Sequence, residues 1–107
     1  MIVHNVYFTL HDNSPAARRH LLDACRKYLV DHPGILAFAC GTLAEDHVRP
    51  VNDRDFDVSL HITFADKAAH DRYQASEAHD RFVAENKPNW KRSRVFDSVI
   101  DWTVDHP

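Results

Sequence analysis

Residues 56–64, FDVSLHITF, alternate apolar and polar side chains along their whole length. In an extended chain successive side chains point to opposite faces. The apolar residues that share one face of this segment are Phe56, Val58, Leu60, Ile62 and Phe64. Such a run is typical of a β-strand that packs one face on a core. A fold for this chain must therefore contain a sheet with at least one covered face.

Three other segments have strand character. Residues 2–10, IVHNVYFTL, and 94–104, RVFDSVIDWTV, are rich in β-branched and aromatic residues. Residues 35–43, ILAFACGTL, are apolar, and the small residues Ala37, Ala39 and Gly41 share one face, where we expect space for a helix or a ligand. Residues 44–55 are polar and contain a proline, which predicts a long exposed loop.

Two helical regions separate these strands. The tetrapeptide DNSP at 12–15 predicts a helix start, because its serine can cap a first turn and its proline suits the first helical position. Pro33-Gly34 should stop this helix. The second region follows Asp66, a plausible N-cap, and ends before Pro88. Within it Ser76 can cap a second helical piece, so we expect a broken helix.

The order of elements is β-α-β-β-α-β over a single domain, residues 1–107. This order predicts an α+β, ferredoxin-like fold, with helices on one face of a four-stranded antiparallel sheet. The other face is expected to carry Tyr7, Phe38 and Cys40. Because an open apolar face is poorly protected, we expect a homodimer formed through the sheet faces.

Composition excludes several function classes. A formal net charge of -3 argues against nucleic-acid binding. No apolar run approaches the length of a membrane span, and the start of the chain does not read as a signal peptide. Cys25 and Cys40 are interpreted as free thiols of a cytoplasmic protein. With only Gly34 and Gly41 available, no glycine-rich phosphate loop exists, and we expect no cofactor.

Five segments together resemble one known family. IVHNVYFTL (2–10), HPGI (32–35), DVSLHITFAD (57–66), YQASEAHDRFV (73–83) and FDSVIDW (96–102) have the order and spacing of the stress-responsive A/B barrel domain, a dimeric α/β barrel. The resemblance covers essentially the whole chain. It implies a small stress-responsive protein that forms a homodimer in which two sheets make one barrel. Many members have no established activity, and a few plant members are polyketide cyclases.

The resemblance also implies candidate catalytic residues. The cyclases use a tyrosine and a histidine that match Tyr73 and His79, and a first-strand histidine that matches His4. Another cyclase histidine falls at Val58 here, which departs from the cyclase pattern. A neutral imidazole can act as a general base, and a tyrosine hydroxyl can donate to a developing enolate. On a continuous helix Tyr73 and His79 would point about 120° apart, so their convergence depends on the break at Ser76.

We expect these residues to share a pocket between sheet and helices. Its other predicted lining residues are Val6, Phe8, Ala37, Ala39, Val58, Leu60 and Phe82. The leading interpretation is binding of a small, partly apolar organic molecule. The alternatives are a cofactor-free enzyme, of polyketide-cyclase-like lyase or monooxygenase type, and a structural oligomer that resists stress. In the structural interpretation the histidines and the tyrosine only pack and hydrogen-bond.

Nine histidines also raise the question of a metal site. An oxygen-rich cluster across strands could form from Asp55, Asp57 and His61 with Asp97 or Asp101. No ligand spacing of a known metal motif is present, so we expect no metal. The pair His70-Asp71 is predicted to be exposed.

Overall fold

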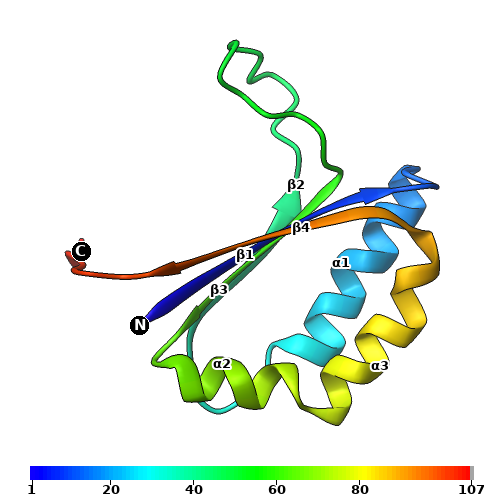
Figure 1. Cartoon of the computed structure of the whole chain (residues 1–107). Helices are drawn as coiled ribbons and strands as arrows, with labels where there is room; N and C mark the ends of the chain where they lie inside the picture. The colour runs from blue at the N-terminus through cyan, green and yellow to red at the C-terminus, as the bar shows by residue number, and fades with distance from the viewer. Residues whose placement is uncertain (107) are drawn as a thin grey trace.

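The computed structural model describes residues 1–106. Its elements are β1 (Ile2–Leu10), α1 (Pro15–Leu29), β2 (Ile35–Thr42), β3 (Val58–Phe64), α2 (Lys67–Gln74), α3 (Glu77–Asn86), a short 3-10 helix η1 (Lys87–Asn89) and β4 (Trp90–Val99). The strands form one antiparallel sheet in the order β2-β3-β1-β4. All three α-helices cover the same face of this sheet (Figure 1). The predicted ferredoxin-like α+β fold is confirmed.

The central strand β1 fixes the register of the sheet. It places Val6 opposite Leu60 of β3, and His4 opposite both Ile62 of β3 and Asp97 of β4. Opposed residues of neighbouring strands share a face of the sheet. Most of the buried core lies between the helix-facing side of the sheet and the helices, and its largest fully buried side chains are Leu29, Val58, Leu60, Ile62, Phe64 and Tyr73.

The predicted helix caps are confirmed. The side chains of Ser14, Asp66 and Ser76 each accept a hydrogen bond from a backbone N–H in the first turn of α1, α2 and α3. The second helical region is therefore broken at Ser76. Its second helix, α3, ends at Asn86, which agrees with the predicted end before Pro88. These boundaries are set by local chemistry, which explains why sequence alone located them.

The turn into β2 depends on a glycine. Gly34 has a φ of 89°, a conformation that other residues rarely adopt. A Cβ built on Gly34 would lie 2.4 Å from Cβ of Ala69 in α2. Only glycine therefore lets the start of β2 approach α2 this closely.

The face assignment in β2 was predicted wrongly. Ala37 and Ala39 are exposed and pair with Thr63 and His61, on the face away from the helices. Phe38 and Cys40 instead pack against the core. The cause is a register irregularity between Ile35 and Ala37, which interrupts the alternation of the strand.

The predicted bounds of the last strand are also wrong. β4 begins at Trp90 and ends at Val99, rather than running over residues 94–104. Its partner β1 begins at Ile2, and the last backbone contact joins Ile100 N–H to the Met1 carbonyl. Beyond that point no strand of the described chain lies alongside, so residues 100–106 extend past the sheet (Figure 1).

The face away from the helices remains open. The connection between β2 and β3 rises on this side, as predicted for an exposed loop (Figure 1). Large apolar side chains are exposed on this loop, on β4 and on the segment after β4, including Val51, Phe96 and Trp102. Within residues 1–106 no helix is both long and apolar enough to cross a membrane.

Candidate active site between the sheet and the helices

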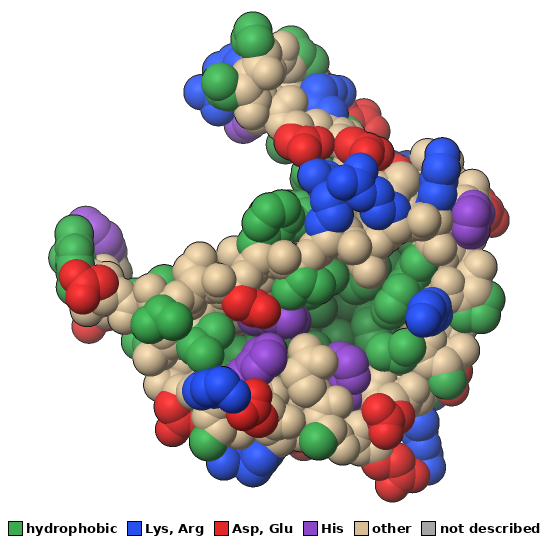
Figure 2. Space-filling model, viewed as in Figure 1, with side chains coloured by type: hydrophobic (Ala, Val, Ile, Leu, Met, Phe, Trp, Pro, Cys, Tyr) green, Lys and Arg blue, Asp and Glu red, His purple; other side chains and the backbone are tan. Residues whose placement is uncertain are grey.

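An open pocket of about 420 Å³ lies between the sheet and the helical layer formed by α2 and α3. Figure 2 shows it as a hollow with apolar side chains inside and histidines at its rim. Its apolar wall includes Val6, Phe8, Leu60, Phe82 and Trp90. Its polar end is formed by His4, His70, Tyr73, His79 and Asp97. The pocket therefore has two chemically distinct ends.

A histidine and an aspartate from neighbouring strands form the base of the polar end. Nδ1 of His4 lies 2.5 Å from Oδ1 of Asp97. His4 is 3% exposed. Burial lowers the pKa of His4, although the carboxylate of Asp97 acts in the opposite direction. A neutral His4 donates its Nδ1 proton to the carboxylate, which leaves Nε2 with a free lone pair.

The helix break brings Tyr73 and His79 together. Their ring centroids are 4.9 Å apart, although the two residues belong to different helices. Between them Ser76 has an extended backbone, with ψ of 150°. Its Oγ accepts from the N–H of His79 at 3.1 Å and donates to the carbonyl of Tyr73 at 2.8 Å. The ring of Tyr73 also lies 6.1 Å from that of His4, so the structure brings all three predicted residues to one place.

The environment sets the protonation of these groups. Burial lowers the pKa of His79, although the nearby Asp80 acts the other way. Burial raises the pKa of the Tyr73 hydroxyl. At neutral pH His4 and His79 are therefore neutral imidazoles, which can accept a proton, and the phenol of Tyr73 stays protonated and can donate a hydrogen bond.

The other predicted lining residues divide into two groups. Val6, Phe8, Leu60 and Phe82 line the pocket. Val58 is fully buried within the core and does not line the pocket. Ala37 and Ala39 lie on the opposite face of the sheet, so their predicted place in the pocket is wrong for the reason given above.

Sequence reasoning missed two polar residues of the site. Asp97 belongs to the site because the β1–β4 register places it opposite His4. The pairing register of two strands cannot be predicted from the sequence of one strand alone. His70 was predicted to be exposed, but its side chain is only 19% exposed and lines the pocket. A signal for His70 was available, because it precedes Tyr73 by three residues and so shares its helix face.

The metal cluster considered from the sequence does not form. His61 instead pairs through Nδ1 with the side-chain oxygen of Asn5 at 2.8 Å, and through Nε2 with the hydroxyl of Ser59 at 3.0 Å. Asp57 accepts from the N–H of Leu10, and Asp55 pairs with Arg92. These residues have protein partners of their own.

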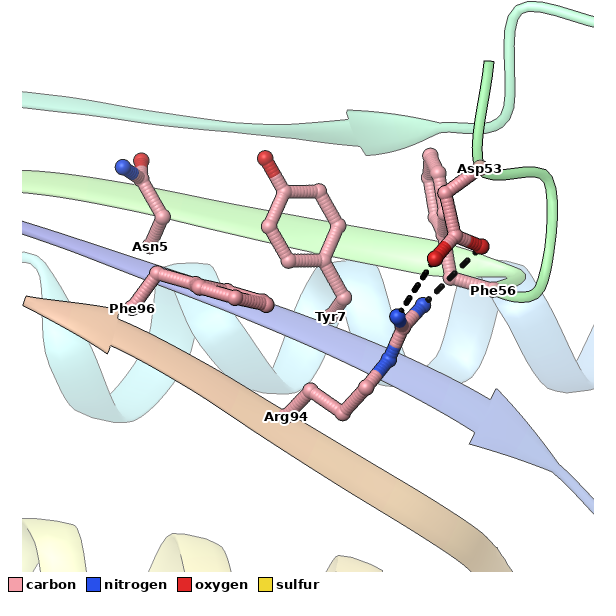
Figure 3. A pocket seen from close by; sticks show the side chains of 6 residues that line it. All are labelled: Asn5, Tyr7, Asp53, Phe56, Arg94 and Phe96. Atoms are coloured by element: carbon pink, nitrogen blue, oxygen red, sulfur yellow. Dashed lines mark hydrogen bonds and ion pairs between the residues drawn. The ribbon is translucent and has the colours of Figure 1, made fainter. Parts of the chain in front are cut away.

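A second, open pocket of about 390 Å³ lies on the open face of the sheet (Figure 3). The ring of Tyr7 stands between Phe56, at 5.0 Å between centroids, and Phe96, at 5.8 Å. Phe56 was predicted to share the face of Val58 and Leu60, which is wrong because it precedes the start of β3 at Val58 and is outside the alternation of the strand. At one side Arg94 of β4 binds Asp53 of the β2–β3 loop, with 2.7 Å between Nη1 and Oδ2. This pair ties the base of the loop to the sheet beside an aromatic surface.

Comparison with known proteins decides the family. Residues 2–100 match the family model described as "Stress responsive A/B Barrel Domain". The chain belongs to this family. The resemblance seen in the sequence is therefore confirmed. No curated protein gives a significant sequence match.

Solved structures show the same fold as this A/B barrel domain. A Dabb family protein with a ferredoxin-like fold from Mesorhizobium loti is 27% identical, with a TM-score of 0.75 over 92% of this chain and 95% of that chain. A dimeric ferredoxin-like protein of unknown function from Thermobifida fusca is 17% identical, with a TM-score of 0.76 over 92% and 90%. A hydroxynitrile lyase from Passiflora edulis is 20% identical, with a TM-score of 0.75 over 97% and 96%.

Proposed function

We propose that this A/B barrel domain binds a small, partly apolar organic molecule in the pocket between the sheet and the helices. The observation that carries this proposal is the division of the pocket into an apolar wall and a polar end. Its volume of about 420 Å³ falls in the range of small-molecule sites, roughly 300–1,000 Å³. Such sites combine apolar walls with a few placed polar groups that orient the ligand.

The apolar wall favours a ligand with a ring or a short aliphatic chain. The ring of Phe8 lies 4.7 Å from that of Trp90 and 6.3 Å from that of Phe82, measured between centroids. At the polar end Tyr73 supplies a hydroxyl donor, and the neutral imidazoles of His4 and His79 supply acceptors. A carbonyl or hydroxyl group on the ligand would match this end.

A second candidate function is a cofactor-free, lyase-type reaction. The observation that favours it is the His4–Asp97 pair, which orients an imidazole beside Tyr73 and His79. In this reaction a neutral imidazole takes a proton from a substrate hydroxyl, or from a carbon next to a carbonyl. Tyr73 donates a hydrogen bond to the resulting alkoxide or enolate oxygen. The bond to the leaving group then breaks, its electron pair leaves with that group, and the imidazolium gives the proton to the leaving group.

The proposed assembly is a homodimer through the open sheet faces. Phe96 is 53% exposed on that face, next to Tyr7, and a partner sheet would cover both. The structural neighbours from Thermobifida fusca and Bacteroides fragilis are described as dimeric, which supports this assembly. Both cysteines are free, and the reducing cytoplasm is the compartment we propose.

The test is a thermal-shift screen of small aromatic and aliphatic aldehydes, ketones and hydroxynitriles against the full chain. A ligand at about 100 times its Kd stabilises the folded state by about 2.7 kcal/mol, which raises the Tm of a domain this size by roughly 10 °C or more. Compounds that give such a shift are then titrated against His79→Ala, with His47→Ala on the exposed loop as the matched control.

Each function predicts a different result. For a binding protein, His79→Ala weakens binding, His47→Ala does not, and no product appears. For a lyase, His79→Ala and Tyr73→Phe remain folded but lose product formation, followed by chromatography. For a structural oligomer, no compound shifts the Tm and His79→Ala changes only stability or assembly. A screen without hits would remove the proposed ligand-binding function.

A further inference from the structure

The polar end of the pocket holds three side chains that carry metal-ligand atoms. One such atom from each of His4, His70 and Asp97 lies within 4.8 Å of the other two. They come from β1, α2 and β4, which are distant in sequence. The fold brings these three residues together, and no sequence motif predicts the cluster.

His70 shows an unsatisfied polar atom at this place. Its Nε2 is buried and has no hydrogen-bond partner among the described residues. Its Nδ1 lies 3.4 Å from Oδ1 of the neighbouring Asp71. Buried polar atoms nearly always have a partner, so an orphaned ring nitrogen needs an explanation. A metal-bound histidine often places its second nitrogen next to a carboxylate, as His70 does here with Asp71.

The other two side chains are already in contact. Nδ1 of His4 and Oδ1 of Asp97 are 2.5 Å apart, and the ring of His4 lies 5.1 Å from that of His70. The side chain of His4 is 4% exposed and fixed, whereas that of Asp97 is 46% exposed and has room to move. A small outward movement of Asp97 would admit an ion between the two groups. The ring proton of His4 then moves from Nδ1 to Nε2.

The surrounding charge permits a cation. Asp97 contributes a carboxylate, and none of the described residues that line the pocket is Lys or Arg. Two imidazoles and one carboxylate suit zinc and neighbouring divalent transition metals. Calcium and magnesium prefer sets made of oxygen atoms. Three protein ligands leave a coordination position for water or a ligand, as in catalytic rather than structural zinc sites.

We propose that His4, His70 and Asp97 form a mononuclear site for a divalent transition metal of the zinc class, with one coordination position open to the pocket. The site goes beyond the organic-ligand pocket, since it needs only His4, His70 and Asp97. With the metal bound, His4 no longer offers an acceptor, and Tyr73 and His79 supply the polar contacts to an organic molecule. It also replaces the oxygen-rich cluster considered from the sequence, which has other partners in the fold.

The test uses the metal alone with the full chain. Protein stripped with a chelator is titrated with Zn²⁺ by calorimetry and with Co²⁺ by visible absorption. We expect one ion per chain, and Co²⁺ bands that report mixed nitrogen and oxygen ligation. His70→Gln should weaken Zn²⁺ binding by about 100-fold or more, since even indirect supporting residues are worth roughly 10–100-fold. The exposed control His47→Gln should leave the affinity unchanged.

Two further variants keep the test decisive. Asp97→Asn changes a half-exposed side chain and keeps a hydrogen-bond acceptor for His4, so it should fold and still lose Zn²⁺ affinity. Phe82→Leu alters only the apolar wall and should retain the Zn²⁺ affinity. This variant separates a failed metal site from a failed organic-ligand site. Zn²⁺ binding that is undiminished in both His70→Gln and Asp97→Asn, or that is lost equally in His47→Gln, would overturn the proposal. So would the absence of one-to-one binding.

Discussion

Removing the serine at the helix break should destabilise the protein more than removing a similar cap elsewhere. Ser76 accepts from the N–H of His79, and loss of an N-cap side chain costs about 1 kcal/mol. Its hydroxyl also donates to the carbonyl of Tyr73. The backbone N–H of Ser76 donates to the same carbonyl at 3.2 Å, and this bond remains when the side chain is removed. Loss of the hydroxyl's bond to Tyr73 adds only about 0.5 kcal/mol. Ser76→Ala should therefore cost about 1.5 kcal/mol, or roughly 6–12 °C in Tm.

The chain offers a matched control for this experiment. Ser14 is also half-buried and caps α1 by accepting from the N–H of Ala17 at 3.2 Å. Among residues 1–106 its hydroxyl donates to no backbone carbonyl, and no residue of α1 lines the pocket. Ser14→Ala should cost about 1 kcal/mol and lower the Tm by roughly 4–8 °C. Ser76→Asp keeps an acceptor at the cap and should restore most of the loss.

The two variants should differ most clearly at the pocket. Fraying of the first turn of α3 exposes His79, so Ser76→Ala should raise the pKa of His79 toward its ordinary value. Ser14→Ala should leave that pKa unchanged. Thermal unfolding gives the stabilities, and imidazole signals in an NMR pH titration give the pKa. The reasoning is refuted if Ser76→Ala is as stable as the parent chain, or if both variants leave His79 unaffected.

Three shorter predictions concern pH, the buried pair and the open face. Burial lowers the pKa of His4, His61 and His79 below the ordinary 6.5, so below that pH the unfolded chain binds protons that the folded chain does not. Urea unfolding should show full stability above about pH 6.5 and a decline as the pH falls below it; a flat profile contradicts this. Asp97→Ala should cost about 1–3 kcal/mol by leaving Nδ1 of buried His4 unpaired, whereas Asp97→Asn should cost less than about 1 kcal/mol; equal losses in denaturant unfolding would count against the pair. Phe96→Asp should convert the proposed dimer to monomer in sedimentation, and an unchanged dimer would place the interface elsewhere.

Features that depend on near neighbours in sequence were predictable. The alternation in β3 and the apolar face of β1 identified two strands, and so put Val6, Phe8 and Leu60 on the helix-facing side of the sheet. The caps at Asp66 and Ser76 were predictable because a capping side chain bonds to a backbone N–H only a few residues away. Because the break at Ser76 was visible, the approach of Tyr73 to His79 could also be foreseen.

Features that depend on a partner strand were not predictable. The irregularity after Ile35 moves Ala37 and Ala39 to the open face, and nothing in the local pattern of residues 35–43 signals it. The end of β4 is fixed by where β1 begins, so the apolar residues after Val99 read as strand although they have no strand to pair with.

The sequence by itself determined the fold class and the broken helix. It did so because amphipathic periodicity and capping act over a few residues. Only the tertiary structure decided that Asp97 would pair with His4 and that His70 would join them, since strand register and helix docking bring together residues far apart in the chain. Register is set by the packing of the whole sheet, and so the chemistry of the pocket's polar end appears only when the chain is folded.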